Sequence, residues 1–525
     1  MRFIAAPQIP PSAFDICDTV DCFDFCRMSA VISRSEVLAA QKAWADALLK
    51  ISADYKSGGY SKAKATATDV ILGAYNYQYS PVAFKPTLTS APQTFRPTFE
   101  GALSYFVGGN PAYPNDKGFA LESSTGAQWS SYKIDNNVIQ LDGDSSISMG
   151  NISIYDAKGN ATIVDKTFGF SKGLDGIVRI NLHHSSRAAL DQASLPAEDL
   201  RQVASNSSYS VKLTDVLSAQ TGWCEALIKI SADYKSGGFS KAKATAENVI
   251  DQAYNYQFGP VAFKPTLASA PQTFRPTFDG ALSYFVGGNS TYPSDLALSN
   301  GVGGFALVSP QGNPWSSFKI ENKVVQLDGD SAISLGNIYL YDDKNNATVV
   351  DKTFGWNKSS DGTMRLNLHH SSSRTPSPSL TDSPTGAPLY RFLDRADGSH
   401  LFTNNVKEID AITGARFSYE GIGFNTPNNG TQALYRFYNS SKDAHLYTAS
   451  EAEKNALVAP SSGYALEGTV GNVLASGSVV ATSAPVYRLF NASSGKHLFT
   501  IDQLERSNLL ASSTGWASEG VGFYV

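Results

Sequence analysis

The chain has 525 residues, of which 42% are hydrophobic and 11% aromatic, and its formal net charge is −5. A chain of this length exceeds what one hydrophobic core supports, so about three or four globular domains are expected. The slightly negative net charge argues against a protein that binds nucleic acid or anionic lipid through a basic surface. No apolar run in the sequence is long enough to span a bilayer.

Residues 1–33 are predicted to form a tail outside the folded domains. Their apolar stretch is interrupted by prolines and followed by acids, which makes it a poor signal peptide. Cys17, Cys22 and Cys26 lie there, at a spacing that matches no zinc template. Cys224 falls on a predicted helix, where a core position is expected. We therefore expect no structural disulfide, no metal and no cofactor.

A long internal repeat dominates the next 340 residues or so. "ALLKISADYKSGGYSKAKATA" at 47–67 returns as "ALIKISADYKSGGFSKAKATA" at 226–246. The repeat predicts two related domains, 34–187 and 214–374, joined by a linker over 188–213. Such close similarity indicates a recent duplication.

Each copy begins with helical periodicity and continues with strands. In the first copy, apolar residues recur at steps of three and four along one helix face, namely Val37, Trp44, Leu48, Ile51 and Tyr55. Ser35, or Thr214 in the second copy, is the predicted N-cap. "NVIQLDGDSSISMGNISIYD" predicts a hairpin around an Asp-Gly turn, and "ATIVDKTFGFSKGLDGIVRINLHH" predicts another.

Helices followed by a long antiparallel sheet, with a last strand that ends in His-His-Ser, resemble the NTF2-like (SnoaL-like) cone fold. The closing segments "RINLHHSS" and "RLNLHHSS" are similar to the association domain of calcium/calmodulin-dependent kinase II. This resemblance implies a small-molecule ligand in each cone. It also implies pairing through the sheet, either between the two domains of one chain or in a homo-oligomer.

The paired histidines of the closing segments are assigned by strand alternation. One histidine of each pair, His184 or His370, is predicted to face the cone cavity together with Asp165 or Asp351. Such a pair could act as acid and base if the protein is an enzyme. It could also bind a ligand, or only satisfy buried polarity.

The other histidine of each pair, His183 or His369, is predicted to face outwards, on the face that also carries aromatic side chains. Aromatic side chains on an exposed sheet face usually pack against another domain or subunit. An interface role is therefore expected for these two histidines.

Four basic residues near "FKPT" and "TFRPTF" could hold an anionic ligand or be solvated, namely Lys85, Arg96, Lys264 and Arg275. "LDGDSSISMGN" is read as a hairpin turn rather than a calcium loop.

After a Ser/Pro/Thr-rich linker at 375–387, three short units follow in 388–525. The units begin with "LYRFLDRADGSHLFT", "LYRFYNSSKDAHLYT" and "VYRLFNASSGKHLFT". Each unit continues into a short polar helix and then a strand that contains Glu-Gly. They resemble a three-fold repeat domain of unassigned function that is often appended to secreted hydrolases. This resemblance slightly favours an extracellular setting.

Each short unit holds one histidine, at His400, His445 and His497. Aromatic rings beside polar groups suit carbohydrate, so these histidines are candidate ligand-binding residues and a glycan a candidate partner.

The expected fold is α+β, with two tandem NTF2-like cone domains and a C-terminal all-β, β-trefoil-like domain. The expected function is that of a non-catalytic binding protein whose cone domains assemble and hold a small ligand. The first alternative is a SnoaL-like isomerase, cyclase or hydrolase that uses the Asp/His pairs. The second is an oligomerisation scaffold.

Overall fold

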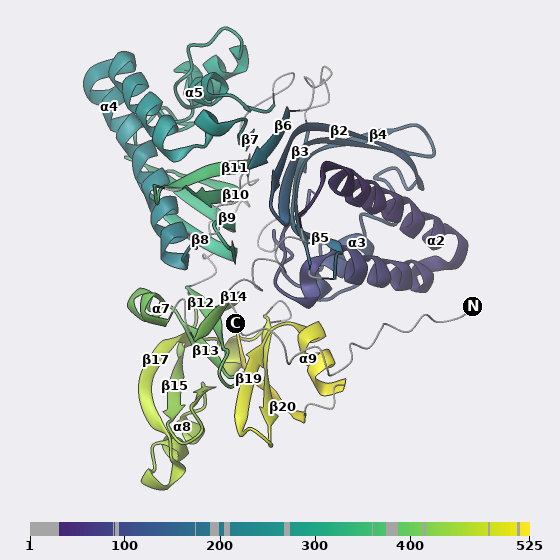
Figure 1. Cartoon of the computed structure of the whole chain (residues 1–525), viewed down its shortest axis with the longest axis vertical. Coiled ribbons are helices and arrows are strands. Elements are labelled where there is room, and N and C mark those ends of the chain that lie inside the picture. Colours follow the sequence, from purple (N-terminus) through teal and green to yellow (C-terminus); the bar gives the residue numbers. More distant parts are fainter. Residues whose placement is uncertain are drawn as a thin grey trace, which may run out of the picture.

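The computed structural model describes residues 31–87, 89, 94–173, 175–188, 199–203, 210–266, 273–359, 361–373, 387–412, 416–480, 483–511 and 515–525. The three cysteines of the predicted tail, most of the linker at 188–213 and most of the Ser/Pro/Thr linker lie outside these residues. Figure 1 shows two helix-on-sheet domains side by side, with a third domain of short strands below them.

The first domain packs a long helix, α2 (Arg34–Ala74), on a curved sheet. The helix starts at Ser33, not at the predicted Ser35, because Ser33 and Glu36 form a capping box. It breaks at Gly59, whose φ of 70° is a conformation that favours glycine. A shorter helix, α3 (Phe99–Val107), packs beside it. The predicted apolar stripe faces the sheet, and Trp44, Leu48 and Ile51 are buried.

The sheet of the first domain has the strand order β1-β5-β4-β3-β2-β6. The two predicted hairpins are present as antiparallel pairs. The strands are β1 (Ala83–Lys85), β2 (Trp129–Asp142), β3 (Ser145–Asp156), β4 (Ala161–Lys172), β5 (Val178–Arg187) and β6 (Asp199–Val203). The turn between β2 and β3 uses Gly143 at a φ of 56°, as expected of the Asp-Gly pair.

The second domain repeats this architecture. Its helix starts after Lys212 rather than Thr214. Its elements are α4 (Leu213–Ala253), β7 (Ala262–Lys264), α5 (Phe278–Val286), α6 (Leu298–Gly301), β8 (Trp315–Asp328), β9 (Ser331–Asp342), β10 (Ala347–Lys358) and β11 (Met364–Ser373). The sheet order is β7-β11-β10-β9-β8.

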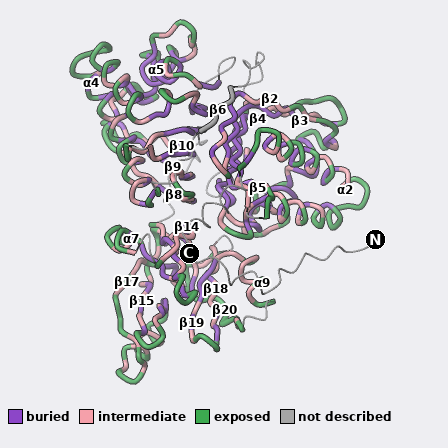
Figure 2. Tube along the Cα trace, viewed as in Figure 1, coloured by how far each residue is buried: buried purple, intermediate pink, exposed green. Residues whose placement is uncertain are grey.

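The two cone domains pack sheet against sheet, with their helices outermost (Figure 1). In Figure 2 the facing strands are buried and the outer sides of α2 and α4 are exposed. Side chains from both sheets form one apolar cluster between the domains: Ala83, Phe95, Val138, Ile147, Met149, Leu182, Ala262, Phe274, Val324, Leu335 and Leu368. The expected pairing of the two domains within one chain is therefore present in the structure.

A β-bulge decides which side chains of the last strand face this interface. Between Gly169 and Phe170 the register on β5 moves from Leu182 to Ile180 and skips Asn181. Ile180 then packs under the helices, whereas Leu182 packs against the other domain. Strict alternation predicts Ile180 and Leu182 on the same face. That prediction is wrong, because the bulged residue Asn181 reverses the alternation beyond it. The same shift occurs at Gly355 and Trp356 in the second copy.

The third domain consists of three similar units, each with a three-stranded sheet and a short helix. The first unit has β12 (Pro388–Asp394), β13 (His400–Thr403), α7 (Val406–Ile412) and β14 (Phe417–Asn425). The second has β15 (Gln432–Asn439), β16 (Ala444–Thr448), α8 (Glu451–Leu457) and β17 (Ala465–Val473). The third has β18 (Pro485–Asn491), β19 (Lys496–Thr500), α9 (Gln503–Ala511) and β20 (Trp516–Tyr524).

Ion pairs join the three units in a closed order. Arg391 of the first unit pairs with Glu505 on α9, Arg436 with Glu408 on α7, and Arg488 with Glu453 on α8. Each arginine therefore receives a carboxylate from the helix of the preceding unit. The three ion pairs thus link the units one to the next, and a β-trefoil is not confirmed.

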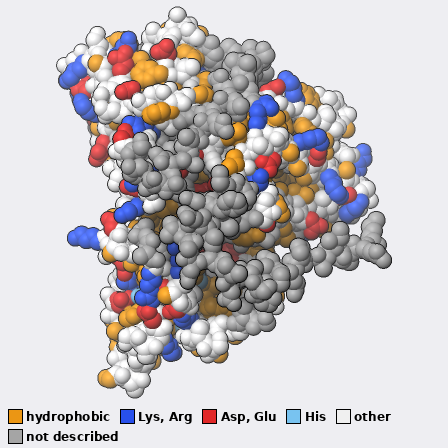
Figure 3. All heavy atoms as spheres, viewed as in Figure 1, with side chains coloured by type: hydrophobic (Ala, Val, Ile, Leu, Met, Phe, Trp, Pro, Cys, Tyr) orange, Lys and Arg blue, Asp and Glu red, His pale blue; other side chains and the backbone are white. Residues whose placement is uncertain are grey.

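The third domain contacts both cone domains. Tyr419 on β14 donates a hydrogen bond to the carbonyl of Val325 on β8, at 3.1 Å. On the other side α9 packs against α3, and Leu504 packs on the core of the first domain. Figure 3 shows basic and acidic side chains interspersed over the coloured part of the visible face. Among the described residues, no helix is both long and apolar enough to cross a membrane.

The α3–α9 contact buries a pair of carboxyl groups. Burial, and then the nearby Asp502, raise the pKa of Glu100 to about 7. Burial also raises the pKa of Asp502, which Arg391 partly offsets. An unfolded glutamate titrates near about 4.3, so between that pH and about 7 the unfolded chain binds fewer protons than the folded one. Stability should therefore fall as the pH rises through this window.

Glu100→Gln should remove this part of the pH dependence, and thermal unfolding measured from about pH 4.5 to 7.5 tests it. Asp279→Asn is the matched control, because Asp279 holds the same position on α5 of the second copy. An unchanged slope in Glu100→Gln, or an equal change in the control, would count against the carboxyl pair.

Candidate functional site

The interior of each cone holds a buried chain of four polar side chains. In the first domain, Trp44 Nε1 on α2 donates to the hydroxyl of Tyr75, at 3.0 Å. That hydroxyl lies 2.8 Å from His183 Nδ1, and His183 Nε2 lies 2.6 Å from Lys166 Nζ on β4. Both nitrogens of the His183 ring are therefore engaged, and the whole chain lies between helix α2 and the sheet.

The charges in this chain are suppressed by burial. Burial, and then Lys166, hold the pKa of His183 well below its usual range. Burial, and then Lys85, hold the pKa of Lys166 well below its usual range. Burial therefore favours the uncharged form of both side chains, an arrangement in which His183 Nε2–H donates to the amine while Nδ1 accepts from Tyr75. An imidazole and a free amine together form an uncharged base.

Aromatic rings enclose the histidine. The Phe84 ring stacks on His183 at 4.2 Å between centroids, and Trp44 meets it edge-on at 5.5 Å. The Tyr105 ring on α3 packs edge-on against Phe84 at 5.6 Å. Lys166 Nζ lies 4.6 Å from the centre of the Trp44 ring, so an ammonium at this position would be stabilised by the ring face.

A second polar group lies two residues further along the same face of β5. Ser185 is fully buried, and its hydroxyl is hydrogen-bonded to that of Thr87, which follows β1. Lys85 donates to the Ser185 carbonyl at 3.1 Å and so fixes the backbone. Tyr105 interacts with Thr87, and burial raises the pKa of Tyr105, so its hydroxyl stays protonated. Three neutral hydroxyl groups thus gather beside the histidine.

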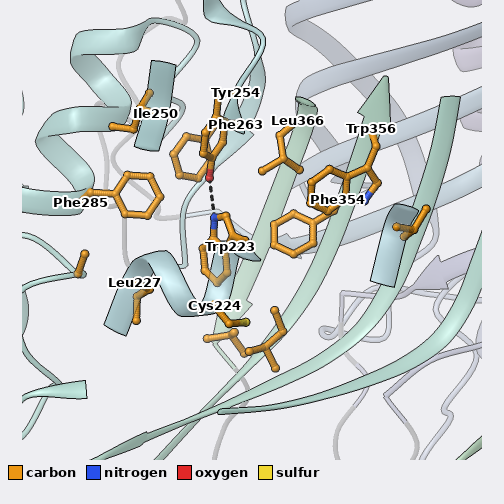
Figure 4. Packing of buried hydrophobic residues seen from close by; sticks show 14 of the residues in the cluster. Trp223, Cys224, Leu227, Ile250, Tyr254, Phe263, Phe285, Phe354, Trp356 and Leu366 are labelled. Atoms are coloured by element: carbon orange, nitrogen blue, oxygen red, sulfur yellow. Dashed lines mark hydrogen bonds between the residues drawn. The ribbon is translucent and has the colours of Figure 1, made fainter. Parts of the chain in front are cut away.

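The second domain reproduces the polar chain with closely similar distances. Trp223 Nε1 donates to Tyr254 at 3.0 Å, the Tyr254 hydroxyl lies 2.8 Å from His369 Nδ1, and Lys352 Nζ lies 2.8 Å from His369 Nε2. Figure 4 shows Trp223 and Tyr254 pointing toward one another amid the aromatic cluster.

The hydroxyl group of the second domain is likewise present. Thr266 and Ser371 are hydrogen-bonded to each other, and Lys264 donates to the Ser371 carbonyl at 3.2 Å. Burial lowers the pKa of Lys352 to about 7. The chain therefore carries two equivalent interior sites.

The histidines predicted to face the cavity lie instead between the two domains. His184 and His370 stack with ring centroids 3.7 Å apart. His184 Nδ1 lies 2.7 Å from Thr353 Oγ1, and His370 Nδ1 lies 2.7 Å from Thr167 Oγ1. The β-bulge at Asn181 explains the reversal, since it moves His183 inward and His184 outward.

The predicted carboxylates also lie at the domain interface. Asp165 lies 3.8 Å from Lys264, and Asp351 lies 3.7 Å from Lys85, each across the interface. Asp165 and His184 do share a face, as predicted, but that face contacts the other domain and not a cone interior. An acid–base role for these pairs stays a prediction, and the arrangement does not favour it.

The predicted basic ligand residues are buried and paired. Arg96 forms a salt bridge with Asp116 at 2.6 Å, and Arg275 forms one with Asp295 at 2.8 Å. Lys85 and Lys264 hold the backbone of the last strands. Of the two alternatives, solvation is wrong, because all four residues are buried. Their placement favours a positioning role over contact with an anion, which stays a prediction.

The three histidines of the short units lie beside a repeated Arg–Glu pair. His400, His445 and His497 approach Glu420, Glu467 and Glu519 at 3.2, 3.4 and 3.3 Å. Each of these glutamates also binds the arginine of its own unit. The predicted ligand-binding role of these histidines stays a prediction, and their contacts fit the network that joins the units.

One group of acids among the described residues is close enough to hold a metal ion, namely Asp394, Asp397 and Asp443. Arg416 binds both Asp394 and Asp443, and Lys496 lies 2.8 Å from Asp397. The cations of the protein itself already neutralise this group.

Most residues of the interior sites were missed in the sequence. Strand alternation predicts Lys166 on the outer face beside the aromatic side chains, which is wrong, because Lys166 is buried against His183. No sequence pattern assigns a role to Tyr105 or Ser185. The signal that could have found them is the Phe168-Gly169 step, repeated as Phe354-Gly355. A Cβ on Gly169 would lie 2.6 Å from Asn181 Oδ1, which marks a bulge at that point.

Comparisons with known proteins identify both repeats. A family described as "Metal-independent carbonic anhydrase" matches residues 35–187 and 214–373, and a domain of unknown function matches 388–525. A metal-independent carbonic anhydrase of Nostoc sp. (strain PCC 7120) is 51% identical over 159 residues, which cover 30% of this chain and 75% of that protein.

Solved structures are also similar to the chain. The iota-carbonic anhydrase of a cyanobacterium, complexed with bicarbonate, shares 49% identity, with a TM-score of 0.29 over 32% of this chain and 96% of that one. A putative calcium/calmodulin-dependent protein kinase II association domain from Xanthomonas campestris shares 19% sequence identity, with a TM-score of 0.20 over 36% of this chain and 97% of that one. A nuclear transport factor 2 (NTF2-like) superfamily protein from Salmonella enterica shares 11% identity, with a TM-score of 0.18 over 32% of this chain and 97% of that one.

These matches correct the expected function. The cone domains were read as non-catalytic binding modules, and the family and the cyanobacterial relative are enzymes. The expected α+β architecture with two sheet-rich tandem domains is confirmed, whereas glycan binding has no support.

Proposed function

Because the chain belongs to the metal-independent carbonic anhydrase family, we propose that it interconverts carbon dioxide and bicarbonate in the interiors of its two cone domains. One observation carries this proposal: each interior joins a neutral histidine–lysine base to a group of buried hydroxyls. This arrangement occurs twice in one chain, at His183 and at His369. The two sites of one chain should therefore catalyse the reaction independently of each other.

The surroundings of the hydroxyl group suit both partners of the reaction. Carbon dioxide is apolar and linear, and the Phe84 and Tyr105 rings offer it an apolar wall. Bicarbonate is planar and anionic, and it needs hydrogen-bond donors. The neutral hydroxyls of Thr87, Tyr105 and Ser185 supply donors where the negative charge develops. Removal from bulk water strengthens these hydrogen bonds.

The histidine–lysine pair supplies the base. Ser185 lies two residues from His183 on the same strand face, roughly 7 Å away, which a single bridging water can span. A water held there loses a proton as its oxygen attacks the carbon. The Tyr75 hydroxyl takes up that proton and gives its own to His183 Nδ1, while Nε2 passes its proton to Lys166. The charge then rests on an ammonium over the Trp44 ring, and bicarbonate leaves before the proton returns to solvent.

Membrane-inlet mass spectrometry of ¹⁸O exchange between carbon dioxide and water tests this function on the full chain. We expect exchange well above that of buffer, and a loss of exchange in the double variant His183→Gln/His369→Gln. His445→Gln, far from either cone, should exchange like the parent protein. Exchange at the buffer rate in the parent protein would rule out the function.

Replacing both lysines with methionine should lower turnover by about 100-fold and change its pH profile. The base must be neutral to accept a proton, so turnover at the second site should rise with pH through about 7, the pKa of Lys352. Lys166→Met/Lys352→Met should lose this limb and turn over slowly and evenly between about pH 6 and 8, because the pKa values of both interior histidines lie below that range.

The matched control for the lysine pair is Lys358→Met on the same strand β10. Lys358 pairs with Asp215 at 2.7 Å near the start of α4, outside the cone interior. Stopped-flow measurement of turnover against pH distinguishes the variants. A parent-like profile in the double variant would contradict the assignment of the lysines.

A further inference from the structure

A cavity of about 690 Å³ lies where all three domains meet. The first cone domain contributes the turn after α2, the β2–β3 hairpin and the β4–β5 hairpin. The second contributes β8, β9 and the bulged part of β10 and β11. Residues 419–421 on β14 close it from the third domain. A space of this size accommodates a small organic molecule.

The cavity lies between the two copies. Equivalent residues from both domains line it, including Gln140 with Gln326 and Asn181 with Asn367. The two glutamines bind backbone carbonyls across the interface: Gln140 donates to the Asn367 carbonyl at 2.9 Å, and Gln326 donates to the Asn181 carbonyl at 3.1 Å. The walls are thus fixed by the pairing of the domains and are not free to collapse.

The amide oxygens of these four residues have no hydrogen-bond partner among the described residues. Gln140 is only 1% exposed and Asn367 only 4%. Buried acceptors are normally paired, and an unpaired one costs about 1–3 kcal/mol. The amide nitrogens of Gln140, Gln326 and Asn181 already donate to the protein. Amide oxygens held in this way beside a cavity favour a guest that brings hydrogen-bond donors.

The charges on the walls are mostly negative. Five carboxylates line the cavity, namely Asp142, Asp144, Asp175, Asp328 and Glu420. Two cations, Lys172 and Arg179, also line it. Lys172 pairs with Glu36 at 2.7 Å, and Arg179 pairs with Asp175 at 2.6 Å. Both wall cations are therefore committed to carboxylates, and Glu420 is in turn paired with Arg391. Five carboxylates against two cations still leave the lining formally negative.

Apolar groups form the remaining walls. Ile147, Phe170, Ile333 and Trp356 come from the two sheets, and Tyr419 comes from the third domain. The indole Nε1 of Trp356 lacks a hydrogen-bond partner among the described residues. A guest that is charged throughout would leave these surfaces uncovered. One with an apolar body would cover them.

We propose that this junction cavity binds an organic cation, a protonated amine carried on an apolar body. The ammonium would lie toward the carboxylates and amide oxygens, and the apolar body would lie against the aromatic side chains. The site exists only where the tandem cone domains and the third domain meet, so it is distinct from the two interior sites.

Phenethylamine is a suitable probe, and its neutral isostere 2-phenylethanol is the control for charge. Titration calorimetry on the full chain should show binding of phenethylamine that weakens as salt is added. The neutral alcohol should bind at least about tenfold more weakly. Equal affinity for the two probes, or no binding of the amine at millimolar concentration, would overturn the proposal.

The duplication offers a matched pair of variants for the same titration. Asp175 lines the cavity, and Asp361 is its counterpart, which pairs with Arg365 in the same way but does not line it. Asp175→Asn should weaken phenethylamine binding by about five- to tenfold. Asp361→Asn should bind like the parent protein. Equal effects of both substitutions would show that the amine binds elsewhere.

Discussion

Replacing Ser185 and Ser371 together with alanine should lower the rate of carbon dioxide hydration by at least about 100-fold. The loss of one donor to a developing oxyanion in a buried site costs about 10²–10³ in turnover. Each serine is fully buried and hydrogen-bonded to a threonine in its own cone interior. Because the two sites lie in separate domains, either single substitution should leave about half of the activity.

The adjacent serines provide the control for this experiment. Ser186 and Ser372 are next in sequence, but they face the other domain and approach the interface histidines at 3.1 and 3.3 Å. Ser186→Ala/Ser372→Ala removes two buried hydroxyls without touching the cone interiors. Stopped-flow hydration assays should find this variant close to the parent protein. If both double variants lose activity equally, the hydroxyls act through stability and not through the reaction.

Phe263→Ala should destabilise the second cone domain by about 3–5 kcal/mol. Phe263 is fully buried and stacks on His369 at 4.2 Å. Its ring also contacts Tyr254, Tyr284 and Phe285. Truncation would leave a cavity among aromatic rings that helices and sheet hold apart, and the midpoint of thermal unfolding should fall by roughly 10 °C. The same change should disorder the histidine and remove turnover at the second site.

Phe258→Ala is the matched control, with the same substitution five residues earlier. The Phe258 side chain is 59% exposed, so its removal should cost less than about 1 kcal/mol. Urea unfolding monitored by fluorescence compares the two variants directly. Similar midpoints for Phe263→Ala and Phe258→Ala would mean that the aromatic cluster does not hold the second domain together.

Much of the fold could be read from the sequence because it is local or repeated. The Asp-Gly turn, the helix stripe through Trp44 and the three short units each rely on nearby residues. The helix starts were displaced by two residues or less, because Ser33 and Lys212 carry the capping interactions instead of Ser35 and Thr214.

The faces of the last strand could not be read, because one residue reverses them. Alternation holds from Val178 to Ile180 and again from Leu182 to His184, but Asn181 forms a bulge between them. The bulge depends on the close approach of Gly169 to Asn181 and Leu182, which is a contact between two strands. The roles of His183 and His184 were exchanged for that reason alone.

The interior site lay beyond sequence reasoning for a related cause. The interior residues lie far apart in the chain, and only the closed cone brings them together: Trp44 on α2, Tyr75 just after it, Thr87 after β1, Lys166 on β4 and Ser185 on β5. All of these residues recur in the second copy. Residues with purely structural roles recur as well, so the duplication does not identify the site. Neutral states of Lys166 and His183 arise from burial, which no spacing in the sequence reveals.

The most direct test of two metal-independent sites is stopped-flow carbon dioxide hydration by the full chain after extensive chelation, with the metal content measured on the same sample. We predict that turnover survives chelation unchanged in the parent protein. We also predict that it drops to the buffer rate in Ser185→Ala/Ser371→Ala. Turnover that disappears with the metal, or that persists in the double variant, would contradict the account of the cone interiors.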